Sequence, residues 1–403
     1  MSDPVQHVLH RTDPATGLAQ PVAAGILAAL TGFASSFAIL LAGFTAAGAS
    51  PAQAASGLFA VSLVMGLLSI VLSLYWRMPV MIAWSTPGAA LLVASGAAAG
   101  SYAVAVGAYI GAALLIVVAG LWRPFGRAVA AIPLGLASAM LAGVLLELCL
   151  APVKATAATP QLALPIVAAW ALGWRFARRY AMVIAVLVAA IVIFAATRVT
   201  PEALAVGLPT PTLVLPAFTP HALIGIGVPL FLVTMASQNL PGLAVMRANG
   251  YELPVRPIFV ATGVASVGTS FLGGHSLNLA AITAALCAGP EAHPEQGKRW
   301  IASVACGATY VVRAFGASAA TAFIERSPPL LIEAVAGLAL LGSLAAALSA
   351  ALDSERERLP AIVTFVTTAS GVSFYGIGAA FWGLLAGGLL MALFRRPGGR
   401  RHE

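Results

Sequence analysis

The sequence predicts an all-α integral membrane protein with about fourteen transmembrane spans, arranged as two inverted repeats of seven. Three observations favour this fold class. Of the 403 residues, 60% are hydrophobic and only 8% are charged, whereas soluble domains carry about 25% charged residues. The apolar segments also suffice for many crossings, because one crossing needs roughly 20 apolar residues. Finally, the basic residues gather in every second loop between the expected spans, which places most of them on one side of the membrane.

The spans follow from the positions of charged and helix-breaking residues. Short and broken segments leave twelve or thirteen spans open as alternatives to fourteen. Forty glycines and 26 prolines argue against uninterrupted helices, and irregular backbone in a membrane must be buried in protein or line a cavity. We expect spans near 20–48, 53–74, 79–96, 101–121, 128–148, 160–175, 180–198, 221–246, 257–272, 275–289, 299–320, 328–351, 359–375 and 378–394.

The basic residues orient these spans. With the N-terminus inside, every Lys and Arg falls in an inner loop except Lys154, Arg198 and Arg326, which lie outside, and Arg313, which lies within a span. A missed span would disrupt this alternation, so both termini are expected in the cytoplasm. The net charge of +8 then reflects orientation in the membrane, and nucleic acid is not an expected partner. The polar, proline-containing N-terminus is unlike a signal peptide.

Seven spans in each half make the second half enter the membrane from the opposite side, as in transporters built from inverted repeats. A proline-rich outer segment lies at the midpoint. We therefore expect an organisation with a cytoplasmic tail at 1–18, a first repeat at 19–198, an extracytoplasmic linker at 199–220, a second repeat at 221–394 and a basic cytoplasmic tail at 395–403.

Two segments occupy the third position of each half and share a pattern. MPVMIAWSTPGAALLV (78–93) and FLGGHSLNLAAITAAL (271–286) each pass from an extended, polar or proline-containing stretch into an apolar helical run. Paired interrupted spans of this kind are a pointer to a transporter's binding site. A helix that begins within the membrane leaves N–H groups unpaired and attracts an anion such as a carboxylate. Glycine-mediated helix packing is the alternative interpretation.

The residues at the two helix starts are candidates for substrate binding. In the third span, Ser85 and Thr86 before Pro87 fit an N-cap with proline in the first turn. In the tenth, Gly273 and Gly274 allow a tight backbone, and Ser276 or Asn278 would cap the helix or bind a ligand.

Two embedded groups are candidates for substrate contact or proton coupling. His275 is the histidine well inside the apolar region; it would donate to a carboxylate or carry a proton, or else be a neutral structural group. Glu333 lies within the twelfth span and would relay a proton or pair with Arg313.

The eighth and first spans add further polar and aromatic candidates. Gln238 and Asn239 precede Pro241 in an otherwise apolar span, and buried amides need partners. They would line a substrate pocket or join helices. Phe33, beside two serines in the first span, is a candidate for contact with a ring.

The sequence does not indicate an enzyme. It contains no HExxH or GxSxG motif and no paired carboxylates at helical spacing, and its three cysteines lack metal-ligand spacing. We expect no metal and no cofactor other than a coupled proton.

ASQNLPGLAVMRANGYELP (236–254) and GTSFLGGHSLNLAAITAAL (268–286) resemble the benzoate:proton symporter family known as BenE, over about residues 15–394. That family is related to the uracil and xanthine permeases. The resemblance implies fourteen spans in two inverted repeats, with spans 1–4 and 8–11 forming a core domain and the others a gate domain. It also implies that spans three and ten are each a short strand plus a half-helix that hold substrate between them.

One departure from the nucleobase permeases bears on the substrate. Acidic residues that grip the base in those proteins correspond here to Asn239 and Leu277. A neutral amide near a helix N-terminus would accept an anion that a carboxylate would repel. This difference favours an aromatic carboxylate over a nucleobase.

The sequence and the resemblance together predict a secondary transporter in the bacterial cytoplasmic (inner) membrane. It would import benzoate or a related aromatic carboxylate by proton symport, with alternating access between core and gate domains. A carrier of another anion, inorganic or dicarboxylate, on the same fold is the main alternative, and a channel is a further one. Expected partners are the aromatic carboxylate, membrane lipid and, as one option, a second copy of the chain in a homodimer.

Overall fold

The computed structural model describes residues 16–130, 133–196, 207–375 and 377–394. The predicted tail 395–403, most of the tail 1–18 and the linker residues 199–206 lie outside this part of the chain. The first half contains α1 (Thr16–Ala34), α2 (Phe37–Ala46), α3 (Pro51–Trp76), β1 (Ile82–Trp84), α4 (Thr86–Ser95), η1 (Gly96–Ala99), α5 (Tyr102–Leu121), α6 (Arg123–Ala130), α7 (Leu134–Ala158), α8 (Pro160–Phe176), η2 (Arg178–Tyr180) and α9 (Ala181–Ala196).

The second half begins with one long, irregular helical segment and ends with a series of single helices. It contains α10 (Pro220–Ala222), η4 (Leu223–Gly227), α11 (Val228–Thr234), η5 (Met235–Asn239), α12 (Leu240–Ala248), α13 (Val255–Ser270), β2 (Leu277–Leu279), α14 (Ile282–Ala288), η6 (Gln296–Lys298), α15 (Trp300–Ala314), α16 (Ala317–Arg326), α17 (Pro329–Leu352), α18 (Arg358–Ala369) and α19 (Ala379–Phe394).

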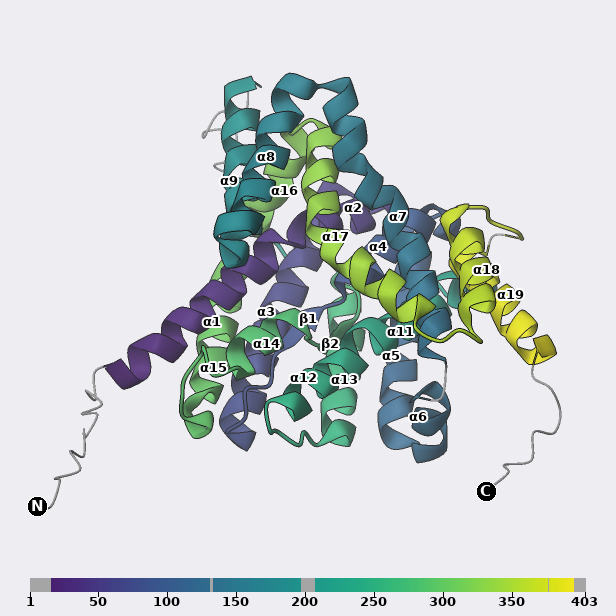
Figure 1. Cartoon of the computed structure of the whole chain (residues 1–403), viewed down its shortest axis with the longest axis horizontal. Helices are drawn as coiled ribbons and strands as arrows, with labels where there is room; N and C mark the ends of the chain where they lie inside the picture. The colour runs from purple at the N-terminus through teal and green to yellow at the C-terminus, as the bar shows by residue number, and fades with distance from the viewer. Residues whose placement is uncertain (1–15, 131–132, 197–206, 376, 395–403) are drawn as a thin grey trace, which may run out of the picture.

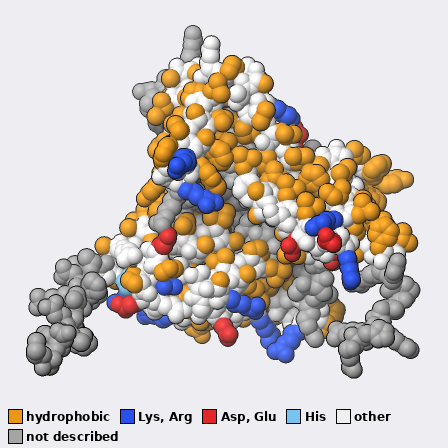
Figure 2. All heavy atoms as spheres, in the orientation of Figure 1, with side chains coloured by type: hydrophobic (Ala, Val, Ile, Leu, Met, Phe, Trp, Pro, Cys, Tyr) orange, Lys and Arg blue, Asp and Glu red, His pale blue; other side chains and the backbone are white. Residues whose placement is uncertain are grey.

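The helices are those of a membrane protein. Within the described residues, six are long and apolar enough to cross a membrane, or seven if the pair α15 and α16, bent by 62°, is one span. Hydrophobic side chains cover much of the face seen in Figure 2. The other expected spans coincide with shorter helices or with the two strand–helix segments. The count of fourteen therefore remains a prediction.

A two-stranded antiparallel sheet lies in the middle of the protein (Figure 1). In β1 and β2, Ala83 is paired with Asn278, and Trp84 with Leu277. Both flanks continue the pairing: the Ser85 N–H donates to the Ser276 carbonyl (3.0 Å), and the Ala280 N–H donates to the Met81 carbonyl (2.8 Å).

Side chains from neighbouring helices complete the edges of this sheet. Ser69 Oγ of α3 accepts from the Ile82 N–H at 2.9 Å. Ser266 Oγ of α13 accepts from the Leu277 N–H at 2.8 Å. A buried N–H without a partner is costly in a membrane interior, so these serines make a strand possible there.

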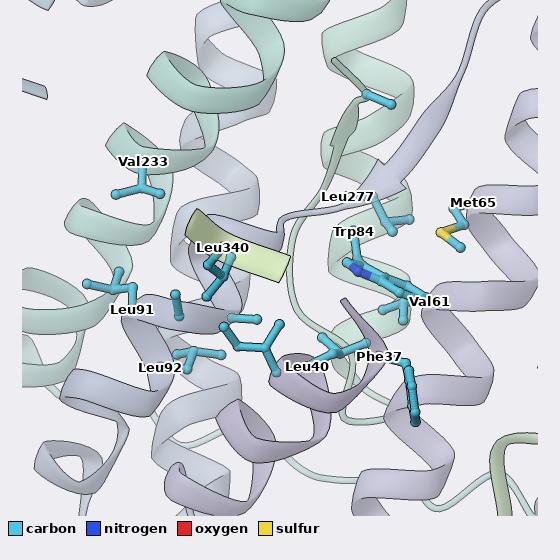
Figure 3. Close-up of a cluster of buried hydrophobic side chains, with 14 of the residues drawn as sticks. Phe37, Leu40, Val61, Met65, Trp84, Leu91, Leu92, Val233, Leu277 and Leu340 are labelled. Carbon is cyan, nitrogen blue, oxygen red and sulfur yellow. The ribbon is translucent and has the colours of Figure 1, made fainter. Parts of the chain in front are cut away.

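The remaining helices form two groups around this centre. α1 to α5 and α10 to α15 surround the strands, with α15 packed on α3 and on α1, and α13 packed on α5. α7, α8, α9, α17, α18 and α19 pack mainly on one another. Figure 3 shows buried side chains at the centre, among them Trp84 of β1, Leu277 of β2 and Met65 of α3.

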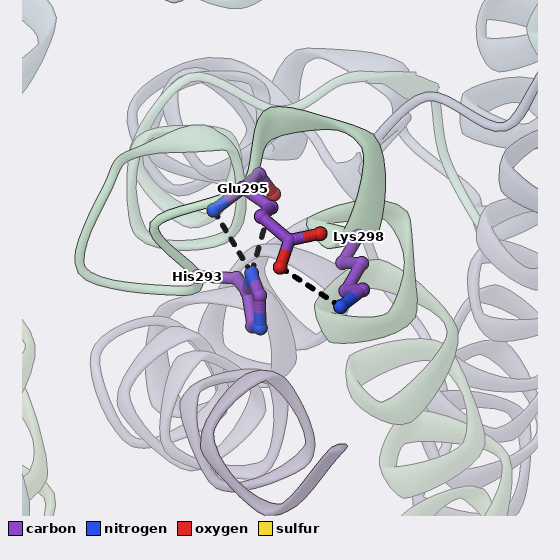
Figure 4. Close-up of polar contacts among 3 residues, drawn as sticks. All are labelled: His293, Glu295 and Lys298. Carbon is purple, nitrogen blue, oxygen red and sulfur yellow. Dashed lines mark hydrogen bonds and ion pairs between the residues drawn. The ribbon is translucent and has the colours of Figure 1, made fainter. Parts of the chain in front are cut away.

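The turn after α14 is fixed by an arginine and a small polar cluster. The buried Arg299 guanidinium donates to the carbonyl oxygens of Ala288 (2.9 Å) and His293 (2.8 Å). In Figure 4, the Glu295 N–H donates to His293 Nδ1, and Lys298 pairs with the Glu295 carboxylate at 2.9 Å. The hydrogen bond from Lys298 lowers the pKa of the Glu295 carboxyl group. These contacts hold the last turn of α14 in place.

Two glycines allow α3 and α15 to cross closely. A Cβ atom on Gly66 would lie 2.6 Å from the Gly307 carbonyl oxygen, and a Cβ atom on Gly307 would lie 2.6 Å from the Gly66 carbonyl oxygen. Both distances are shorter than atoms tolerate, so only glycine fits on each side of the crossing.

We expect Gly307→Ala to destabilise the protein by about 1–3 kcal/mol, because overpacking forces the helices apart. The measurement is the melting temperature of the purified protein in detergent. Gly342→Ala is the matched control, since a Cβ atom there meets nothing within 4 Å. Equal melting temperatures for the two variants would contradict the close crossing.

Candidate functional site

A pocket lies where β1 is followed by α4 and β2 is followed by α14. About 430 Å³ of space, which includes space open to solvent, lies between its lining residues. It is bounded by the starts of α4 and α14, the break between α1 and α2, the π-helix η5, and side chains of α3 and α15. The lining residues are Gly32, Ser35, Ser36, Met65, Ala83, Trp84, Thr86, Gln238, Ala280, Ala281, Ile282, Thr283 and Tyr310.

The start of α4 confirms the predicted cap. Ser85 is the N-cap residue; its Oγ accepts from the Gly88 N–H at 3.1 Å and from the Thr234 hydroxyl at 2.9 Å. Pro87 carries no N–H. The N–H and hydroxyl of Thr86 are therefore the donors left at this helix start, and Thr86 lines the pocket. Ser85 is fully buried behind it.

The start of α14 differs from the expectation, which placed it at Gly274–Asn278. Residues 277–279 are extended because they pair with β1, so the helix begins only at Ile282. Ser276 and Asn278 consequently do not cap it, and no side chain does. Thr283 lies in its first turn, 5% exposed. Thr283 lines the pocket, and its buried hydroxyl has no hydrogen-bond partner among the described residues.

The predicted binding residues before and within β2 are not among those that line the pocket. Gly273 has φ +85° and its carbonyl accepts from the Tyr102 hydroxyl at 2.5 Å. A Cβ atom on Gly274 would lie 2.6 Å from Val61 Cγ1. Ser276 receives the Ser85 N–H through its carbonyl, and Asn278 pairs within the sheet.

His275 lies outside the pocket lining. Its ring is fully buried, edge-on to Phe44 and Tyr109 with centroids 5.7 and 6.4 Å away. Nδ1 is 3.2 Å from the Ser276 carbonyl oxygen. Within the described part of the chain, Nε2 has no hydrogen-bond partner.

The π-helix separates the roles of Gln238 and Asn239. Pro241 lacks the N–H that would bond to the Ser237 carbonyl, and the helix is widened immediately before it. Gln238 lines the pocket, and its amide makes no hydrogen bond to any described residue. Asn239 is fully buried beside β2, where its Oδ1 accepts from the Leu279 N–H at 2.9 Å. The expectation that Asn239 faces the ligand is thus corrected: its amide oxygen is engaged by the strand.

One wall of the pocket is aromatic. Trp84 and Tyr310 line it, with ring centroids 6.5 Å apart. Phe33 stands behind Trp84, edge-on to it at 5.9 Å, and is not among the lining residues. The Arg313 guanidinium lies 4.2 Å above the Phe33 ring.

Glu333 lies apart from this pocket. Its side chain is exposed and lines a separate cavity between α2, α3, α16 and α17, together with Glu325. Among the described residues it makes no ion pair with Arg313, so that alternative is wrong.

The pocket includes residues that the sequence did not single out. Thr283, Met65 and Tyr310 are single polar or apolar side chains in apolar helices, without a motif of their own. Only Thr283 had a position that hinted at the pocket, because it lies in the apolar helical run of the interrupted tenth segment.

The model of the BenE family, described as benzoate membrane transport protein, matches residues 17–393. The chain belongs to this family. It is 41% identical to inner membrane protein YdcO of Escherichia coli over 91% of its length and 93% of that protein. It is 34% identical to the benzoate membrane transport protein of Acinetobacter baylyi over 93% and 95% of the two chains.

Solved structures show the fold. The transmembrane domain of the cyanobacterial bicarbonate transporter BicA is 14% identical, with a TM-score of 0.59 over 92% of this chain and 97% of that one. The murine anion transporter Slc26a9 in its inward-facing state is 14% identical, with a TM-score of 0.60 over 97% and 74% of the two chains. The BenE-family chain is therefore a helical membrane transporter and not an enzyme.

Replacing Asn239 and Gln238 separates structure from binding. We expect Asn239→Leu to lower the free energy of unfolding by about 1–3 kcal/mol, because it leaves the Leu279 N–H buried and unpaired. Gln238→Leu, at a half-buried position with no bonded partner, should leave it nearly unchanged. Thermal unfolding in detergent compares the two. The same loss in both variants would mean that Asn239 does not hold β2.

Proposed function

We propose that this transporter imports benzoate or a closely related aromatic carboxylate together with a proton. The observation that carries the proposal is the meeting of two helix starts at a pocket with uncharged polar donors and an aromatic wall. Neither Asp nor Glu is among its described lining residues, so nothing there repels an anion. Family membership and the name of the Acinetobacter relative support the substrate class.

The carboxylate would bind between the starts of α4 and α14. Thr86 offers an N–H and a hydroxyl from α4, and Thr283 offers an unpartnered hydroxyl from α14. The positive end of the α4 dipole points to the same place. Gln238 would donate its free amide from η5. Ser85, Asn239, Gly274, Ser276 and Asn278 would then act by positioning these groups.

The ring would lie against Trp84 and Tyr310, with Met65 closing the apolar side. Phe33 would support Trp84 from behind rather than contact the ring. Arg313, held over Phe33, is not among the lining residues.

We propose the wider architecture on the same basis. Fourteen spans would form two inverted repeats, at 19–198 and 221–394, joined by the linker 199–220. The antiparallel pairing of two strand–helix segments supports this symmetry. The helices around the strands would form a core domain that moves against a gate domain of the others, with both termini in the cytoplasm of a bacterium and the chain in its inner membrane.

Proton coupling follows from the charge of the substrate. Benzoic acid has a carboxyl group with a pKa of roughly 4, so the anion prevails at neutral pH. Uptake with one proton would be electroneutral and driven by the pH gradient. His275 is the preferred carrier, because it is buried close to β2 and has an unpartnered Nε2. Glu333, exposed in another cavity, is the second candidate.

Transport by purified protein in liposomes tests the proposal. Under an inward proton gradient, radiolabelled benzoate should accumulate above equilibrium, and a protonophore should abolish the accumulation. Folded protein that accumulates bicarbonate or another inorganic anion, without competition by benzoate, would favour the second candidate function. The fold shared with a bicarbonate transporter is the observation behind that alternative.

Thr283→Val should weaken benzoate binding roughly tenfold, since a hydrogen bond to a charged group contributes about 1.5–3 kcal/mol. The change keeps the shape of the side chain and removes the hydroxyl. Titration calorimetry on the purified variant measures the affinity. Thr364→Val, in α18 with its hydroxyl bonded to the Pro360 carbonyl, is the matched control. Unchanged affinity in Thr283→Val would place the carboxylate elsewhere.

His275→Gln should abolish proton-driven accumulation while exchange of internal for external benzoate continues, because the amide cannot carry the proton. Both activities are measured in the same liposomes. His293→Gln, in the turn after α14, controls for loss of a histidine. Normal accumulation by His275→Gln would exclude His275 as the carrier.

A further inference from the structure

A third cavity, distinct from the pocket at the helix starts and from the cavity beside Glu333, lies on the face that the distribution of basic residues predicts to be cytoplasmic. It is bordered by the end of α5, the helix α6, α12 and the start of α13, and about 1190 Å³ of space, which includes space open to solvent, lies between them. It shares no lining residue with the first pocket.

Three arginines from three elements border this cavity. Arg123 begins α6, Arg247 lies in the last turn of α12 and Arg256 in the first turn of α13. All three are exposed, and none of their guanidinium groups makes an ion pair or hydrogen bond with a described residue. Glu252, in the intervening turn, is likewise unpaired with them. Figure 2 shows Lys and Arg side chains gathered along the lower edge of the molecule, where these helices end.

The interior of the cavity is apolar. Leu243 and Phe259 form its walls, and Met235 of η5 lines it as well. Beside it, Trp122 is 59% exposed and stacks on Phe125 with centroids 6.2 Å apart. Exposed tryptophan next to arginine is typical of the membrane–water interface. The cavity therefore opens at the level of the lipid headgroups.

We propose that this cavity binds an anionic phospholipid, with its phosphate among Arg123, Arg247 and Arg256 and an acyl chain along the apolar interior. Arginine recognises phosphate through paired N–H donors, and basic pockets between cytoplasmic helix ends bind such headgroups. A free phosphate would use the arginines but not the apolar walls. The apolar walls therefore favour the lipid.

The bound chain would touch the helix that serves the first pocket. Met235 lies in the cavity lining, and its sulfur is 3.2 Å from Asn239 Nδ2. A lipid there would brace the π-helix from which Gln238 reaches the other pocket.

Native mass spectrometry of the detergent-purified protein tests the site. Phosphatidylglycerol should bind about tenfold more tightly than phosphatidylcholine of the same chain length, and inorganic phosphate should not displace it at equal concentration. The triple variant Arg123→Gln, Arg247→Gln, Arg256→Gln should lose the preference. The triple variant Arg175→Gln, Arg178→Gln, Arg356→Gln removes the same charge from the same predicted face outside the cavity and should keep it.

A second variant probes the apolar half without changing charge. Ala244→Phe, at an exposed position in the cavity lining, should reduce phosphatidylglycerol binding by filling the space for the chain. The proposal is overturned if the first triple variant retains the preference, if Ala244→Phe binds like the wild type, or if inorganic phosphate displaces the lipid. Neither assay depends on transport.

Discussion

The need to satisfy the backbone of two strands in the middle of a membrane protein governs the structure around its pocket. A helix satisfies its own N–H and carbonyl groups, but a two-stranded sheet exposes half of them at its edges. Here, side chains of other elements accept hydrogen bonds from N–H groups at those edges. Ser69 of α3 receives the Ile82 N–H, while Ser266 of α13 and Asn239 of η5 receive those of Leu277 and Leu279.

The pairing of the two strands determines the position of the pocket. Each strand leads into a helix that begins within the protein, and antiparallel pairing brings the two helix starts to one place. The same requirement keeps the neighbouring helices close. Gly242 approaches the Ala280 carbonyl oxygen so tightly that a Cβ atom would lie 2.8 Å from it. Under the proposed function, uncharged donors at the helix starts, rather than charged side chains, would give the pocket a preference for an anion.

Much of this centre could be predicted from sequence, because local chemistry leaves a local pattern. Ser85 followed by Thr86 and Pro87 is a pattern that favours a helix start. The structure confirms that α4 begins there. The interruption of the tenth segment was also predicted, but its helix start was misplaced. Glycine, serine and asparagine fit a cap as well as a strand, and only pairing with a distant segment decides between them.

The division between Gln238 and Asn239 could not be predicted, because it depends on how the widened helix turns each side chain. Nor could the roles of Ser69 and Ser266, which are ordinary serines in apolar helices. Tyr310 and Met65 reach the pocket from helices whose sequences carry no motif. Such residues reach the pocket because of how distant helices pack together. No pattern of spacing along the chain indicates that packing.

The central claim is that an aromatic carboxylate binds between the starts of α4 and α14. Crystals grown with 4-bromobenzoate test it directly, since anomalous scattering locates the bromine. We predict one bromine peak beside Trp84 and Tyr310, with the carboxylate within hydrogen-bond distance of Thr86 and Thr283. A peak in the cavity beside Glu333, with the pocket between the helix starts empty, would contradict the account.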